Sequence, residues 1–257
     1  MERFKNSQRR ELRMLEFFAG KAVVSEALHN YGSYWRTRSI DKDPNSRATD
    51  KIDFMKVRWK NIGKLPDFIW ITLPCFTHSF LARGDNRSTK ENWFAKAPEA
   101  LWQDRFLARM SWFLEWVKKK NDHVIFVIEN PTGWMGEMAM IKTIVGKMEM
   151  RRTTVDYCVS GGSDKVSTNL WTNDSKLHAA LSMFSKSSPE SCSHHGRPYP
   201  HHPRYKPAEI SRDLAETVAE SVSARFGVND LKVCYKAEPE VSTEEITFFN
   251  KMMGGAD

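Results

Sequence analysis

The feature that most constrains the fold of this chain is a regular alternation between short apolar runs and segments with helical periodicity. The apolar runs predict strands at residues 12–18, 35–41, 67–73, 124–128 and 153–159. Two of them, DFIWITL and VIFVI, are almost entirely apolar, which is typical of strands buried on both faces of a parallel sheet. Strands that alternate with helices in this way predict an α/β fold, in which a parallel sheet is covered by helices on both faces.

Three further segments carry apolar residues at helical spacing, at residues 23–29, 98–120 and 207–226. The stripe of the second consists of Leu101, Phe106, Met110, Phe113, Leu114 and Val117. Residues 173–206 are different, because they hold most of the histidines and show little apolar periodicity. We therefore expect a core over residues 12–172, a small loop-rich insertion over 173–206, a helix returning to the core over 207–228 and an acidic tail over 229–257.

The length, cysteine content and charge of the chain limit the classes of protein to which it can belong. The chain has 257 residues, enough for one large domain with a buried core. It contains no run of about 18 apolar residues, so no membrane span is expected. Its first residues are too charged for a secretory signal. Four cysteines, at positions 75, 158, 192 and 234, show no paired framework and favour a reduced, intracellular protein. The net charge of +7 permits a polyanionic partner without demonstrating one.

Small, polar and reactive residues stand at the ends of four predicted strands. They are Phe18-Ala19-Gly20, Asp41, Leu73-Pro74-Cys75 and Glu129-Asn130-Pro131. Ligands of open parallel sheets bind beyond the carboxyl ends of the strands, so these residues are candidates for one common site. Each also has a plain structural interpretation: a turn glycine, an aspartate that caps a loop, a cysteine packed in the core and a helix-start signal.

The order of these residues resembles the motif order of the cytosine carbon-5 DNA methyltransferases, in particular their compact phage and viral forms. The segments that carry the resemblance are LEFFAG at residues 15–20, SIDKDP at 39–44, Asp53-Phe54, Pro74-Cys75 with Ser79, VIENP at 127–131, and residues 157–173, which end in TNLWTN. Any one of these motifs is weak evidence, but six in register are specific. They cover roughly residues 12–173 and, more weakly, residues 205–226.

The resemblance implies a Rossmann-like, S-adenosylmethionine-dependent methyltransferase sheet and methyl transfer to carbon 5 of cytosine in DNA. Cys75 would attack carbon 6 of a flipped-out base, and Glu129 would hold ring nitrogen 3 and the exocyclic amine. Lys165 stands where the family has a catalytic arginine, and Val159 where it has a glutamine. Ala22 replaces a usual second glycine. The implied cofactor-binding residues are Phe18, Ala19, Gly20, Asp41, Asp53 and Pro74.

The resemblance also implies contacts with duplex DNA. The implied nucleic-acid-binding residues are Ser79, Arg83, Arg87, Lys90, Thr168, Arg197 and Arg204. The insertion at residues 173–206 stands where the family places its target-recognition region, and its small size leads us to expect either little sequence specificity or a protein partner that supplies it. Its cysteine and histidines match no standard zinc spacing, so no metal is expected.

Two other functions stay open. The same chemistry could act on tRNA, as one branch of the family does. A catalytically weak homologue could instead bind DNA or regulate a partner enzyme, which the departures at Val159 and Lys165 favour. In each case we expect an intracellular protein that meets nucleic acid, with no membrane partner, in a nucleus or in the cytoplasm of a prokaryotic or phage host.

Overall fold

The computed structural model describes residues 10–59, 62–74, 87–88, 94–157, 167–185 and 210–228. Its strands are β1 (Leu12–Phe17), β2 (Trp35–Asp41), β3 (Asp50–Lys51), β4 (Phe68–Thr72), β5 (Ile125–Pro131), β6 (Arg151–Asp156) and β7 (Ser167–Thr172). Its helices are α1 (Val23–Tyr31), α2 (Pro98–Lys120), α3 (Ala139–Lys147), α4 (Ser175–Ser182) and α5 (Arg212–Arg225), with the short 3-10 helices η1 (Phe54–Lys56) and η4 (Trp134–Glu137). The expected strand at 35–41 and helix at 98–120 agree with the structure to the residue.

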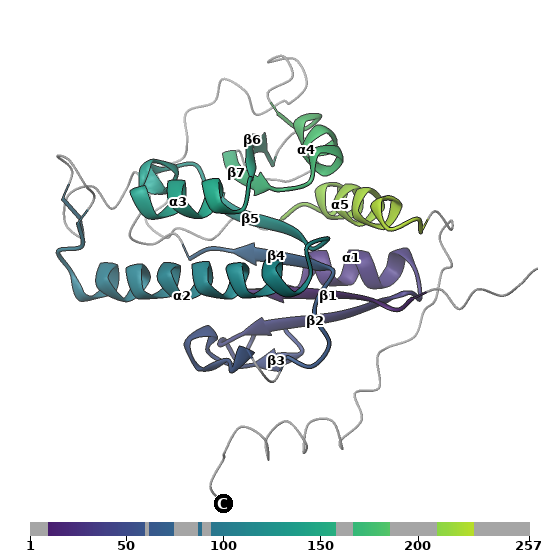
Figure 1. The fold of residues 1–257 in the computed structure, drawn as a ribbon, viewed down its shortest axis with the longest axis horizontal. Coiled ribbons are helices and arrows are strands. Elements are labelled where there is room, and N and C mark those ends of the chain that lie inside the picture. The colour runs from purple at the N-terminus through teal and green to yellow at the C-terminus, as the bar shows by residue number, and fades with distance from the viewer. Residues whose placement is uncertain are drawn as a thin grey trace, which may run out of the picture.

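The strands form one seven-stranded sheet of order β3-β2-β1-β4-β5-β7-β6, which Figure 1 shows from β6 at the top to β3 at the bottom. The neighbouring strands β3, β2, β1, β4 and β5 are parallel to one another, as expected. The expectation of a parallel sheet throughout is wrong, because β7 runs antiparallel to both β5 and β6. The chain between β6 and β7 is too short for a parallel crossover, which needs a dozen residues or more. The Rossmann-like α/β fold class is confirmed.

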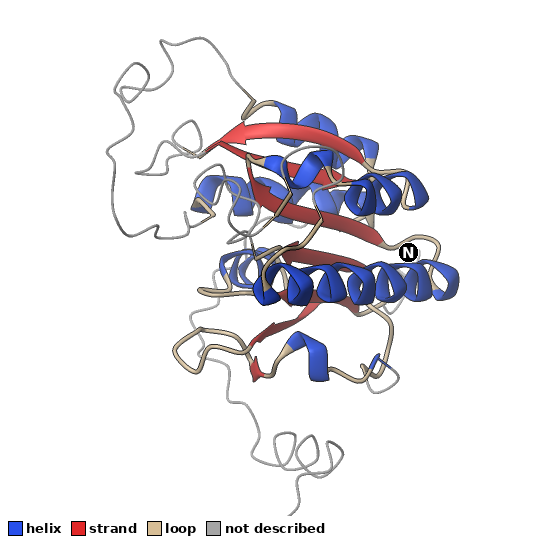
Figure 2. Cartoon of the chain, turned by 90° about the vertical axis from the view of Figure 1, so that its left-hand side faces the viewer, coloured by secondary structure: helices blue, strands red, loops and turns tan. Residues whose placement is uncertain are grey.

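Helices cover both faces of the sheet, and alternate residues of the central strands point to opposite faces. Phe17 and Ile71 pack with α2 and α3 in one hydrophobic cluster. Met14 and Trp70 pack with α1, α4 and α5 in the other. Figure 2 shows the helices lying against the strands. This two-sided burial explains why the strands have near-continuous apolar sequences rather than alternating ones.

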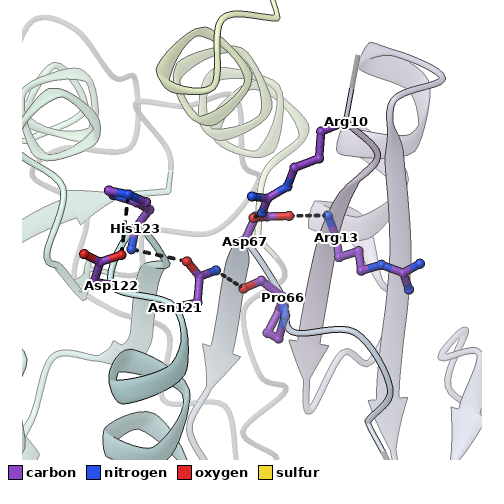
Figure 3. A network of polar contacts seen from close by, with 7 residues as sticks. All are labelled: Arg10, Arg13, Pro66, Asp67, Asn121, Asp122 and His123. Atoms are coloured by element: carbon purple, nitrogen blue, oxygen red, sulfur yellow. Dashed lines mark hydrogen bonds and ion pairs between the residues drawn. The ribbon is translucent and has the colours of Figure 1, made fainter. Parts of the chain in front are cut away.

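A polar network fixes the edge of the sheet where the central parallel strands begin (Figure 3). The Asp67 carboxylate, just before β4, accepts a hydrogen bond from the backbone N–H of Arg13 at 3.0 Å and pairs with Arg10. Nearby, Asn121 at the end of α2 donates to the Pro66 carbonyl at 2.9 Å. Burial raises the pKa of Asp67. With the amino ends of β1 and β4 and the end of α2 tied here, the opposite edge is left for the loops that carry the candidate site.

The structure differs from the sequence-based expectation in the segment at 173–206. Residues 175–182 form α4, whose Leu177 and Leu181 are buried against β6 and α5 in the core rather than in a separate insertion. Asp174 caps this helix by accepting from the backbone N–H of Leu177. Leu101, expected in the buried stripe of α2, is 51% exposed, while the other five members of that stripe are fully buried. Within the part of the chain that the structure describes, no helix is long and apolar enough to cross a membrane.

Candidate active site

The turn after β1 has an unusual backbone. Phe18, Gly20 and Ala22 adopt left-handed conformations with φ of 57°, 51° and 54°. For the two residues other than glycine this costs roughly 1–2 kcal/mol each, and such strain concentrates where a backbone is shaped around a ligand. A Cβ built on Gly20 would meet no atom within 4 Å. The turn therefore presents its backbone to open space, as a cofactor-binding turn requires.

Asp41, the last residue of β2, is tied to this turn. Its Oδ2 accepts a hydrogen bond from the backbone N–H of Gly20 at 2.9 Å, and its Oδ1 accepts one from Asp43 at 2.9 Å. The pairing of β1 with β2, with Phe17 opposite Ile40, brings the two strand ends together. Each carboxylate oxygen has a second lone pair, so Asp41 retains the capacity to accept from a ribose diol while it fixes the turn.

An aromatic group borders the turn. The Phe18 ring lies 5.5 Å from Phe54 and 5.0 Å from Phe106, and Trp102 stacks on Phe106 at 5.9 Å. Lys42, next to Asp41 in sequence, places its ammonium group 5.4 Å from the Trp102 ring. Phe54 and Phe106 are buried, so the rings of this group that can meet a flat aromatic ligand are the partly buried Phe18 and Trp102. Lys42 and Trp102 also line an adjoining cleft of about 540 Å³ together with Pro98, Glu99, Leu101 and Arg105.

Asp53 begins η1 and acts as its N-cap. Its Oδ1 accepts a hydrogen bond from the backbone N–H of Met55 at 2.8 Å. This cap fixes the start of η1 and hence Phe54, which is buried beside Phe18. Asp53 thus lies close to the turn in the fold, and its direct contact with a cofactor stays a prediction.

Glu16, inside β1, is a buried carboxyl group that the sequence analysis did not single out. It is 1% exposed, and its Oε2 accepts from the backbone N–H of Ser25 at 2.9 Å, in the first turn of α1. Burial raises the pKa of Glu16 to about 7, although hydrogen bonds from Ser25 oppose this. A glutamate between Leu15 and Phe17 in a predicted strand was the signal that could have found it. Its carboxyl group joins β1 to the amino end of α1, on either side of the strained turn.

Two side-chain amides hold the end of β4. Asn130 donates to the Leu73 carbonyl at 3.0 Å, and Gln103, fully buried on α2, donates to the Pro74 carbonyl. The Leu73 N–H in turn donates to the Glu129 carbonyl at 2.8 Å. Pro74 is the last residue described before the expected nucleophile, Cys75. The backbone that leads to Cys75 is therefore fixed to β5 and α2, and Gln103 is a second residue that sequence reasoning missed.

Glu129 lies within β5 rather than directly after it, because β5 extends to Pro131 through its pairing with β7. The side chain is 3% exposed. Its Oε1 accepts hydrogen bonds from the Tyr157 hydroxyl at 3.0 Å and from the Thr168 hydroxyl. Burial raises the pKa of Glu129 to about 7, and the two hydrogen bonds oppose this rise. A carboxyl group tuned in this way can either accept or donate a proton near neutral pH.

Two residues expected to bind nucleic acid have other contacts. Thr168 is fully buried and donates to Glu129, because antiparallel pairing places it opposite Pro131 at the end of β5. Arg87 is 3% exposed and donates to the Asp104 carboxylate at 2.7 Å and to the Ala100 carbonyl at 3.0 Å, both on α2. Through these contacts Arg87 anchors its segment to α2, and the roles of Thr168 and Arg87 in nucleic-acid binding stay predictions.

The remaining predicted site residues lie outside the described residues. They are Cys75, Ser79, Arg83, Lys90, Val159, Lys165, Arg197 and Arg204. Their roles therefore stay predictions. The described residues bring together, at one edge of the sheet, Phe18, Ala19, Gly20, Asp41, Pro74 and Glu129. No cluster of three or more histidine, cysteine or acidic side chains suited to a metal occurs among residues that the structure describes.

Comparison with known proteins yields similarities in structure alone. No model of a known protein family matches the chain, and no curated protein matches it in sequence. A mutant of the DNMT2 protein of Spodoptera frugiperda is similar at 13% identity and a TM-score of 0.42, over 63% of this chain and 49% of that protein. The Entamoeba histolytica methyltransferase EhMeth is similar at 10% identity and a TM-score of 0.44, over 65% of this chain and 54% of that protein. The Dnmt2 methyltransferase of S. pombe is similar at 12% identity and a TM-score of 0.41, over 69% of this chain and 56% of that protein. The matched region thus spans about half the length of these three proteins.

Proposed function

We propose that this chain transfers a methyl group from S-adenosylmethionine to carbon 5 of cytosine in DNA. The observation that carries the proposal is the connection between the expected nucleophile and Glu129. Thr72 of β4 lies opposite Glu129 of β5 in the sheet, and Leu73 exchanges hydrogen bonds with Glu129 and Asn130. The chain that enters Cys75 and the buried carboxyl group are thus neighbours at the carboxyl edge of the sheet, where the first sequence motifs also meet.

The residues at the ends of β1 and β2 fit the cofactor. The Phe18–Ala22 turn opens onto space beside Gly20, and Asp41 stands next to it with unused acceptor capacity. The partly buried rings of Phe18 and Trp102 suit contact with an adenine ring, and the buried Phe54 packs beside Phe18. S-adenosylmethionine, when bound, supplies an electrophilic methyl group. Asp41 would hold the ribose hydroxyls, and the turn would approach the rest of the molecule with its backbone.

The chemistry assigns separate roles to Cys75 and Glu129. The thiolate of Cys75 forms a bond to carbon 6 of cytosine, which makes carbon 5 nucleophilic enough to take the methyl group. Glu129 holds nitrogen 3 and the exocyclic amine and stabilises the charge that develops on the ring. Removal of the carbon-5 proton by a base then expels the thiolate and restores the aromatic ring. Cytosine in a duplex must first leave the base stack, at a cost of a few kcal/mol.

The proposed substrate is duplex DNA. The net charge of +7 is compatible with a nucleic acid, and duplex DNA is the substrate that the sequence motifs favour. Specificity for a site in DNA would come from a protein partner, since the segment left for target recognition after α4 is short. The tRNA alternative uses the same chemistry and differs in the nucleic acid that is bound.

The test is transfer of a tritiated methyl group to unmethylated duplex DNA, with a tRNA transcript in parallel. Label in DNA that disappears with Cys75→Ser and Glu129→Gln is the expected result. Label in tRNA alone would replace DNA with tRNA as the substrate. Binding of S-adenosylmethionine without transfer to either nucleic acid would contradict the enzymatic proposal and favour a regulatory protein.

A further inference from the structure

Two buried hydroxyl side chains, Tyr157 and Thr168, meet the buried carboxyl group of Glu129. Tyr157 directly follows β6, and Thr168 lies in β7 opposite Val155 of β6 and Pro131 of β5. Glu129, Tyr157 and Thr168 are 3%, 1% and 0% exposed. Their contact therefore lies in the interior of the sheet and not on its surface. Residues from β7 and from the end of β6 surround one carboxyl group.

Both hydroxyl groups donate to the same oxygen of Glu129. Tyr157 reaches Oε1 at 3.0 Å, and Thr168 reaches the same atom. An ionised carboxylate only accepts hydrogen bonds, so each hydroxyl must act as the donor. Two donors on Oε1 fix the rotation of the carboxyl group about its last bond. Among the described residues no hydrogen bond reaches the second oxygen, Oε2, so Oε2 is the atom left for a substrate.

We propose that Tyr157 and Thr168 are positioning residues that hold Oε1 of Glu129 inside the sheet and direct Oε2 to the cytosine edge. This inference rests on the proposed function, since it assigns the orientation of the group that binds the base. The two hydroxyls do not touch the substrate. They act by keeping Glu129 in one rotamer and by stabilising its ionised form, because hydrogen bonds to a carboxylate favour the charged state.

The variants that test the proposal remove one hydroxyl at a time with little change in shape. Thr168→Val and Tyr157→Phe each delete one donor to Oε1. Thr168→Ser keeps a hydroxyl and should restore most of the function. The matched control is Thr172→Val, which makes the same change at a buried position of the same strand whose hydroxyl accepts from the Asp174 N–H instead of donating to Glu129.

Two measurements are made on each variant. Methyl-transfer kinetics should show a roughly ten- to hundredfold fall in kcat for Thr168→Val and Tyr157→Phe, because a hydrogen bond to a charged group is lost. NMR titration of protein labelled with 13C at the glutamate carboxyl groups follows Glu129 directly, with its signal assigned by its absence in Glu129→Gln. The pKa of Glu129 should rise in both variants and stay at the wild-type value in Thr172→Val.

The two measurements separate this inference from the proposed function. An absence of methyl transfer by the wild-type protein would contradict the proposed function. The Glu129 titration would still decide whether the two hydroxyls set the pKa of that carboxyl group. An unchanged Glu129 titration in folded Thr168→Val and Tyr157→Phe overturns the inference, whatever the activity. If Thr168→Val does not fold, Tyr157→Phe and Thr168→Ser decide the result, since each retains one or both hydroxyl donors.

Discussion

Raising the pH from 5 to 8.5 should destabilise the folded protein through Glu16, and the variant Glu16→Gln should remove this effect. Glu16 is buried, so its uncharged form is favoured, and its pKa is raised from 4.5 to about 7. The nearby Asp41 adds a smaller repulsion in the same direction. The folded state then binds the proton more tightly than the unfolded state does. The stabilisation is fully present below pH 4.5 and is lost as the pH rises through 7.

The magnitude follows from the shift. A difference of roughly 2.5 pKa units corresponds to about 3.4 kcal/mol at about 1.36 kcal/mol per unit. About 0.8 kcal/mol of this is already lost at pH 5, so between pH 5 and 8.5 wild type should lose about 2.5 kcal/mol through this one group. Glutamine has a carbonyl oxygen that can accept from the Ser25 N–H. It carries no titrating proton, so the variant should gain on wild type by that amount over the same interval.

The assay is urea unfolding of wild type and Glu16→Gln at pH 5 and pH 8.5, with the free energy of unfolding extrapolated to water. The comparison of the two proteins at each pH cancels the contributions of all other groups. Glu26→Gln, on the exposed side of α1, controls for the loss of one negative charge. A stability difference between wild type and Glu16→Gln that is the same at both pH values would refute the reasoning, because Glu16 would then not hold a proton in the folded state.

Three other changes have expected outcomes. Ala22→Gly should stabilise the protein by about 1 kcal/mol in thermal or urea unfolding, since Ala22 has φ of 54° and glycine adopts this conformation without strain; a loss of stability would contradict the strain. Asp41→Asn should weaken S-adenosylmethionine binding in calorimetry about ten- to hundredfold, through lost hydrogen bonds from a charged group to the ribose, and equal affinity would remove Asp41 from the site. Arg87→Met should lower the free energy of unfolding by about 1–3 kcal/mol, because it leaves Asp104 and the Ala100 carbonyl without their donor; an unchanged value would show that the anchor is not needed.

The strands and long helices could be predicted because their physical signals are local. Near-continuous apolar runs identified β4 and β5, and the apolar stripe of α2 identified a helix whose ends agree with the structure. Helix α4 was missed because the whole segment was assigned to a loop-rich insertion, although Leu177 and Leu181 stand at helical spacing and Asp174 offered a cap. Leu177 and Leu181 pack on β6 and α5, and which elements they meet depends on the tertiary fold.

Some residues of the candidate site could likewise be predicted from the sequence, and others could not. Gly20 and Asp41 could be found because they follow or end a strand, and Glu129 because it follows the apolar run that predicted β5. Parallel strands bring such positions to one edge. Glu16 carried a signal that was not used, a glutamate next to apolar residues of a predicted strand. Gln103 could not be found, since its role depends on which backbone its face of α2 meets in the fold. Arg87 was expected to meet phosphates because it is a cation near the nucleophile. Its partner Asp104 is on α2, and that pairing depends on the tertiary fold.

The reversal of β7 explains why Thr168 belongs to the site at all. In a fully parallel sheet the first residues of every strand lie at the edge opposite the ligand, and Thr168, near the start of β7, would lie far from Glu129. Because β7 runs antiparallel to β5, its first residues lie beside the last residues of β5, and Thr168 meets Pro131 and Glu129. β6 runs antiparallel to β7 and therefore in the same direction as β5, so Tyr157, the residue after β6, lies on that edge as well. The reversed β7 thus adds the Thr168 hydroxyl to the Tyr157 hydroxyl at the Glu129 carboxyl group, and a parallel β7 would leave Glu129 without the Thr168 donor.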